Sequence, residues 1–157
     1  MQVCFDLMIP KACFGDSFPL LEELSSFGGE SYKQDPPRYM WKEEVKFKCQ
    51  VIPDHILTYI PSEINVTEWN YLSLEGNELE SWEKSINKQT PEESQLPLKQ
   101  MLNELLPLLN EWVVIFELNC DQIDNVYKMN SSMLLDKVNT VLNWNNEPEG
   151  FIAWYKS

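Results

Sequence analysis

Basic residues are scarce in this chain. It carries 12 Lys and Arg against 25 Asp and Glu, which gives a formal net charge of −13 at pH 7. Nucleic acids and anionic membranes would be repelled at long range, so we expect neither as a direct ligand. Basic proteins and cations remain as partners that the charge would attract, and solubility alone is the other explanation of the acidity.

Glycine and histidine are also few, and their scarcity excludes several kinds of site. Of the five glycines only Gly28 and Gly29 are adjacent, whereas phosphate loops and dinucleotide motifs need clustered glycines. A nucleophile activated by an imidazole would depend on His55, the one histidine of the chain. Nothing near it in sequence supports such a pair, and we expect His55 to be a turn residue paired with Asp54.

Paired cysteines and a leader segment are missing as well. The N-terminal apolar stretch has no basic region before it and contains Asp6, unlike a secretory signal. No apolar run approaches the length of a membrane span. The cysteines are far apart, with no zinc-ligand spacing: Cys4, Cys13, Cys49 and Cys120. We therefore expect a cytoplasmic protein with four free thiols.

What is present suffices for one folded domain over residues 1–157, since 43% of the residues are hydrophobic and 12% are aromatic. Alternation of apolar and polar residues predicts a strand over Val45 to Val51, with one face in water. Trp112 to Phe116 is apolar at every position, which predicts a central strand covered on both faces. Further strands are expected at Val3 to Ile9 and Phe151 to Tyr155, with weaker ones at Ile56 to Ile60 and Tyr71 to Leu74.

Helical patterns alternate with these strands. Phe18 to Phe27 precedes two glycines, and Glu78 to Asn87 would form a short acidic helix. Leucines with helical spacing run from Leu98 to Leu109, in a helix that begins at Thr90 or at Pro97 and ends or kinks at Pro107. A last helix follows Asn130. We expect a single α+β domain in which about four helices pack on a mixed or antiparallel sheet.

Three carboxylates follow the predicted central strand: Glu117, Asp121 and Asp124. Acidic groups at a strand end suit a hard cation such as Mg²⁺, or acid–base chemistry. The alternative interpretation is structural, with Asp121 capping a turn and Glu117 facing solvent. A carboxylate-based, metal-dependent or acid–base enzyme is therefore one hypothesis for this chain.

The segment from Glu63 to Glu83 supports another hypothesis, because it contains six carboxylates and no basic residue. Large aromatic side chains lie among the acids. Charge speeds the encounter with a basic partner, and exposed aromatics anchor the contact. The partner-binding residues predicted here are Glu68, Trp69, Tyr71, Glu75, Glu78, Glu80, Trp82 and Glu83. The same pattern would also fit a solvated face with its tryptophans in the core.

In general character the chain resembles the small acidic immunity proteins with which bacteria neutralise their own secreted or contact-delivered toxins. The resemblance rests on the short single-domain chain, its negative charge and the acidic, aromatic segment, without a diagnostic motif. It implies a bacterial, non-enzymatic inhibitor, without a cofactor, that neutralises a basic toxin such as a nuclease by stoichiometric binding. A regulatory interaction module with a partner other than a toxin would use the same surface.

Overall fold

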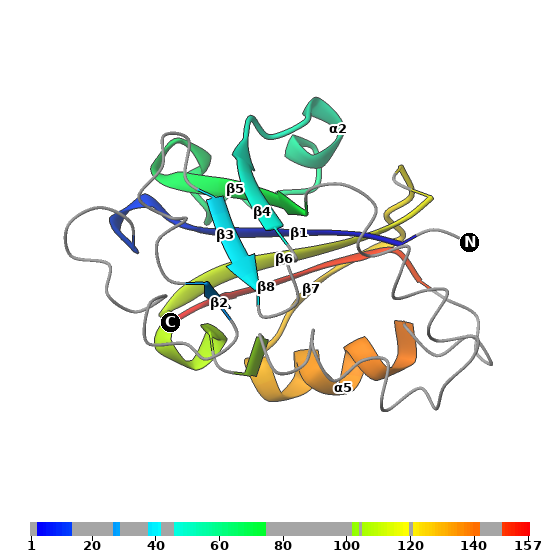
Figure 1. Ribbon diagram of the computed structural model, residues 1–157. Helices are drawn as coiled ribbons and strands as arrows, with labels where there is room; N and C mark the ends of the chain where they lie inside the picture. Colours follow the sequence, from blue (N-terminus) through cyan, green and yellow to red (C-terminus); the bar gives the residue numbers. More distant parts are fainter. Residues whose placement is uncertain are drawn as a thin grey trace.

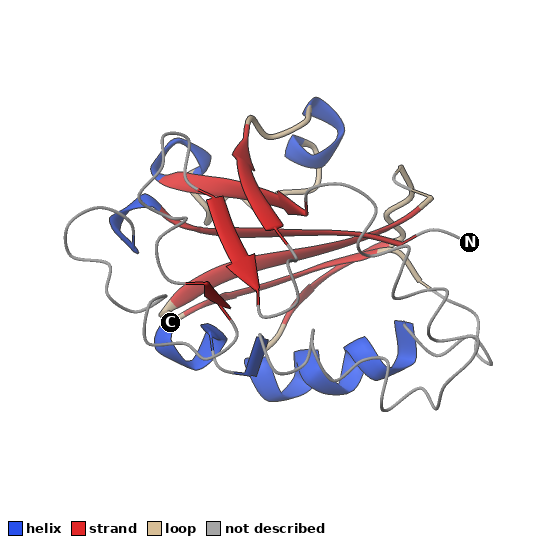
Figure 2. Cartoon of the chain, in the orientation of Figure 1, coloured by secondary structure: helices blue, strands red, loops and turns tan. Residues whose placement is uncertain are grey.

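The computed structural model describes residues 3–13, 27–28, 38–41, 46–74, 102–103, 105–119, 121–141 and 149–157. Within these ranges one β-sheet separates two helices (Figure 1): α2 (Asp54–Leu57) lies on one side and α5 (Ser131–Val141) on the other. Figure 2 shows the strands as the layer between them. The α+β class predicted from the sequence is confirmed.

The sheet is mixed. Its order is β2-β3-β4-β5-β1-β6-β8-β7, and every pairing is antiparallel except the parallel pair β7–β8. The strands are β1 (Val3–Pro10), β2 (Phe27–Gly28), β3 (Arg38–Trp41), β4 (Lys46–Gln50), β5 (Trp69–Leu74), β6 (Glu111–Leu118), β7 (Asn125–Lys128) and β8 (Phe151–Lys156).

Strand β6 lies between β1 and β8, and its residues from Trp112 to Leu118 are all buried. The apolar run therefore does form an interior strand, as predicted. Burying each large aliphatic or aromatic side chain contributes roughly 1.5–3 kcal/mol, so β6 is a main source of stability. Its neighbour β1 is also covered on both faces, since Phe5 to Ile9 are buried without interruption.

The other strand predictions divide into confirmed and wrong ones. Strands β4, β5 and β8 confirm those expected at Val45 to Val51, Tyr71 to Leu74 and Phe151 to Tyr155. The strand expected at Ile56 to Ile60 is wrong, because this stretch contains the end of α2 and the turns after it. The amides of Ile56 and Leu57 both donate to the Pro53 carbonyl, which begins a helical turn.

The described residues do not contain the four helices expected: α2 and α5 are α-helices, and Leu102, Asn103 and Leu105 are the other α-helical residues in the described ranges. Helix α5 confirms the last predicted helix, and the Asn130 side chain caps it by accepting a hydrogen bond from the Met133 amide at 2.9 Å. Three short 3-10 helices accompany them: η1 (Lys11–Cys13), η3 (Val66–Glu68) and η4 (Leu106–Leu108).

The leucine-rich stretch ends where its proline predicts. Leu102 and Leu105 are helical and buried, and the chain then tightens into η4 around Pro107. Leu98 lies outside the described residues, as do the helices predicted before Phe27 and over Glu78 to Asn87, while Phe27 itself belongs to β2.

The prediction of four free thiols is wrong, because Cys4 is disulfide-bonded. The prediction used sequence spacing, which does not show which cysteines approach each other in the fold. No described helix is long and apolar enough to cross a membrane.

Candidate functional site

Two buried carboxylates lie on interior strands of the sheet. Asp6 of β1 is 5% exposed and Glu117 of β6 is 3% exposed, and the described residues contain no other buried charged side chains. Side chains two residues apart on a strand point to the same face of the sheet, so Asp6 shares a face with Met8, and Glu117 shares a face with Ile115. Met8 and Ile115 belong to the core cluster that includes Ile56 of α2. Both carboxylates therefore lie on the α2 side of the sheet.

Tyr71 supports Asp6 from the neighbouring strand. Strands β1 and β5 pair with Asp6 opposite Ser73, and the Tyr71 hydroxyl donates to Asp6 Oδ2 at 2.5 Å. Burial raises the pKa of Asp6 from 3.8 to about 6, against the lowering effect of hydrogen bonds from Tyr71 and Ser73. The nearby charge of Glu117 raises the pKa of Asp6 further. Burial also raises the pKa of Tyr71, so the hydroxyl keeps its proton and remains a donor.

His55 supports Glu117 from α2. Its Nε2 lies 2.9 Å from Glu117 Oε2, and its side chain is 47% exposed while that of Glu117 is 4% exposed. Burial raises the pKa of Glu117, the contact with His55 opposes this rise, and the charge of Asp121 adds to it. His55 thus pairs with Glu117 and holds α2 against the sheet. The pair with Asp54 expected from the sequence is not formed.

These four residues, Asp6, Tyr71, Glu117 and His55, form what we call the buried acid cluster. Two carboxylates with raised pKa bind protons more readily than exposed ones, and the half-exposed His55 contacts one of them, Glu117. None of the four lines the pocket found in the described residues. Through the contact between His55 and Glu117, the cluster positions α2 against the sheet.

The carboxylate site predicted after β6 is not assembled. Glu117 faces inward to His55, while Asp121 and Asp124 are exposed. Asp124 accepts hydrogen bonds from the Gln122 side chain and from the Gly150 amide, so it closes the turn that leads into β8. No group of three or more potential metal ligands occurs among the described residues. The expectation that Glu117 faces solvent is also wrong, because β6 is buried to its end.

Two of the three predicted aromatic anchors, Trp69 and Tyr71, are buried. Trp69 is 5% exposed and Tyr71 is 3% exposed, because β5 is an interior strand whose alternate residues point into the core below α2. Neither can anchor a partner from that position. Glu68 is exposed at the end of η3, as the hypothesis requires. The remaining predicted residues lie outside the described ranges: Glu75, Glu78, Glu80, Trp82 and Glu83.

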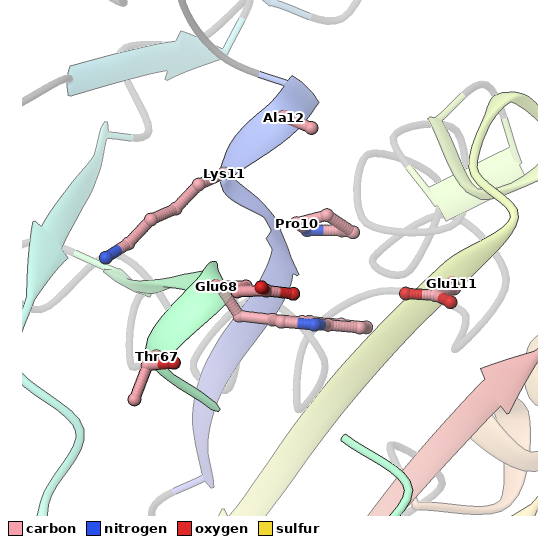
Figure 3. Close-up of a pocket in the computed structure, with 7 residues that line it drawn as sticks. Pro10, Lys11, Ala12, Thr67, Glu68 and Glu111 are labelled. Carbon is pink, nitrogen blue, oxygen red and sulfur yellow. The ribbon is translucent and has the colours of Figure 1, made fainter. Parts of the chain in front are cut away.

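A surface pocket of about 470 Å³ lies where β1 ends beside η3 and the start of β6. In the view of Figure 3 the carboxylates of Glu68 and Glu111 lie on either side of Pro10, and Lys11 extends away from both. Lys156 Nζ is 3.9 Å from a Glu111 oxygen, a long contact at a half-exposed position. Glu68 has no ion-pair partner among the residues described.

Three comparisons with known proteins found no match. No protein-family model matches the chain, no curated protein is significantly similar to it, and no solved structure matches it.

Proposed function

We propose that this chain binds a basic protein and inhibits it by stoichiometric occlusion, in the manner of a toxin immunity protein. The observation that carries the proposal is an acidic segment whose described carboxylates are all exposed. From Cys49 to Glu83 the sequence has seven carboxylates and neither Lys nor Arg. Three of these acids are described, and all three are exposed: Asp54, Glu63 and Glu68.

The position of these acids supports binding more than catalysis. Residues 51–68 cover one face of the sheet through Ile56 and Ile64, so their polar side chains face outward on a fixed support. Exposed carboxylates on a rigid support attract a cationic surface at long range and lose little freedom on contact. The pocket beside Glu68 adds a recess in which a basic side chain of the partner could lie next to a carboxylate.

The first test is genetic and biochemical. A toxin and its immunity protein are encoded side by side, so the neighbouring gene should encode a basic protein that arrests growth when it is expressed alone. Co-expression with this chain should restore growth, and the two proteins should co-elute as a 1:1 complex. If the neighbouring product is neither toxic nor bound, the proposal is wrong. If it is bound without being toxic, the regulatory interaction module is the correct class.

The second test asks whether these exposed carboxylates guide the encounter with the basic partner. The triple variant Asp54→Asn, Glu63→Gln, Glu68→Gln should associate with the neighbouring gene's product roughly tenfold more slowly at low salt, with a flatter dependence on ionic strength. Exposed charges are screened over about 8 Å at physiological ionic strength, so the difference should shrink as salt is added. Asp136→Asn is the control, since this exposed carboxylate lies on α5 across the sheet. Equal association rates for the triple variant and the wild type would contradict the proposal.

A further inference from the structure

Exposed apolar side chains gather around α2. The described residues include six exposed large hydrophobic side chains, and three of them fall within nine residues. Val51 is 90% exposed, Leu57 is 40% exposed and Tyr59 is 41% exposed. We call these three residues the α2 face. The other three are distributed over separate elements: Leu108 in η4, Val126 in β7 and Met133 in α5.

The residues of the α2 face are exposed, whereas neighbouring residues of the same segment pack in the core. Ile56 is completely buried against the sheet, and Ile52 and Ile60 pack against the same core cluster. Leu57 follows Ile56 in this short helix and so points away from the core, and Tyr59, in the turn after the helix, is also exposed. Single exposed apolar residues are ordinary, but a local group of them marks a contact surface.

Several interactions hold this face in one position. His55 binds the buried Glu117, and the Thr58 hydroxyl donates to the His55 carbonyl at 2.8 Å. The Tyr59 amide donates to the Ile56 carbonyl at 2.9 Å, which closes the turn after the helix. A contact surface that is ordered before binding loses less conformational entropy in the complex.

The charge around the α2 face indicates which partner it fits. Residues 51–68 contain three carboxylates and no Lys or Arg. Asp54 lies in α2 itself, and Glu63 follows a few residues later. Lys156 donates to the Glu63 carbonyl, outside α2, at 3.1 Å. An apolar centre with an acidic rim complements an apolar patch surrounded by Lys and Arg.

We propose that Val51, Leu57 and Tyr59 form the apolar centre of the contact with a basic protein partner, with Asp54 and Glu63 at its rim. The inference rests on the proposed function and deepens it. It moves the anchoring role from Trp69 and Tyr71, which are buried in the core, to α2 and the residues beside it. Tyr59 offers a rigid ring with a polar end, a type of side chain enriched where interfaces concentrate their binding energy.

The experiment uses designed peptides as probes of the partner's chemistry. An 18-residue amphipathic helix of Leu and Lys is titrated into ¹⁵N-labelled full-length protein, and a Leu–Glu helix and a Lys homopolymer serve as controls. The Leu–Lys helix should shift the amide resonances of residues 51–59 and leave those of α5 in place. The Leu–Glu helix should not bind, and the Lys homopolymer should bind at least about tenfold more weakly because it lacks the apolar face.

Substitutions then test the centre itself. Leu57→Ala and Tyr59→Ala should each weaken binding of the Leu–Lys helix at least about tenfold, chiefly through faster dissociation. Met133→Ala removes a more exposed apolar side chain from α5 and should change the affinity less than about twofold. Val51→Ser changes a side chain that is 90% exposed, so we expect the fold to be kept and binding of the Leu–Lys helix to weaken, which keeps the test valid if another variant melts early.

The outcomes separate this inference from the proposed function. If the Leu–Lys helix does not bind, or shifts resonances on α5, or binds the α2 variants as well as the wild type, the inference is wrong. If the neighbouring gene's product binds and is unaffected by Leu57→Ala and Tyr59→Ala, the proposed function stands and the α2 face is not its surface. If the peptide maps to the α2 face while the neighbouring product does not bind, the surface stands and the immunity function fails.

Discussion

Glu117 and Glu149 are two glutamates that contact different helices, α2 and α5, and their surroundings move their proton affinities in opposite directions. Glu117 is buried beside His55, and burial raises its pKa. Burial acts in the same sense on Glu149, but hydrogen bonds from Lys137, Tyr127 and Asn125 outweigh it and lower the pKa. A permanent cation and access to water make the difference.

The comparison extends to the residues around each glutamate. Lys137 belongs to α5, is half-buried and also lies 4.9 Å from the Tyr127 ring centre, so the α5 side holds its carboxylate with a shared cation. On the α2 side Glu117 has a second carboxylate, Asp6, for a neighbour. Ionising the buried acid cluster therefore costs free energy, whereas ionising Glu149 contributes to stability.

The largest expected effect comes from removing the charge of Asp6. Its pKa is raised from 3.8 to about 6, so the stability it contributes is fully present below pH 3.8 and is lost as the pH rises through about 6. Two pKa units correspond to about 3 kcal/mol. Asp6→Asn should be up to about 3 kcal/mol more stable than the wild type at pH 8 and nearly equal to it at pH 4. Urea melts at both pH values test this, and equal stability at pH 8 would contradict it.

A smaller effect is expected from deleting the hydroxyl that supports Asp6. Tyr71→Phe should cost about 2 kcal/mol at pH 8, because a buried carboxylate loses its donor, and less at pH 4, where Asp6 is protonated. Its matched control is Tyr127→Phe, which deletes the half-buried hydroxyl that donates to Glu149. This substitution should lower the free energy of unfolding by less than about 1 kcal/mol. Denaturant melts of both variants measure the contrast. If the two substitutions lower the free energy of unfolding equally, the hydroxyl in the buried acid cluster contributes no more to stability than the one on the α5 side.

The smallest effect separates the two glutamates by sign. Glu149 has a lowered pKa, so its stabilising contribution is present above the pKa of the unfolded chain and is lost as the pH falls through the folded value. Glu149→Gln should therefore destabilise the protein at pH 7 by about 1 kcal/mol or less, as for other half-exposed ion pairs. Glu117→Gln should leave the stability at pH 7 unchanged or raise it. Thermal melts at constant ionic strength compare the pair, and a loss of stability in Glu117→Gln larger than that in Glu149→Gln would reverse the assignment.

Patterns along the chain determined much of the fold. Trp112 to Phe116 predicts an interior strand because a run without polar residues has to be covered on both faces. The strand at Phe151 to Tyr155 and the helix after Asn130 could also be predicted, because the strand pattern and the helix cap are local features of the sequence. The net charge, with its excess of acid in the second third of the chain, is a property of composition and needs no structure.

The site was decided only by the tertiary structure. Asp6 is a visible interruption in an apolar run, but nothing local indicates that Tyr71 donates to it from a strand 65 residues later. His55 and Glu117 are 62 residues apart and meet because α2 folds over the sheet. The acidic residues around Trp69 and Tyr71 suggested that both were surface anchors, but β5 is an interior strand and both are buried. Leu57 and Tyr59 are exposed, although Ile56, beside Leu57, is buried. Local patterns specify which residues prefer burial, whereas the pairing of distant strands decides which faces remain open to water.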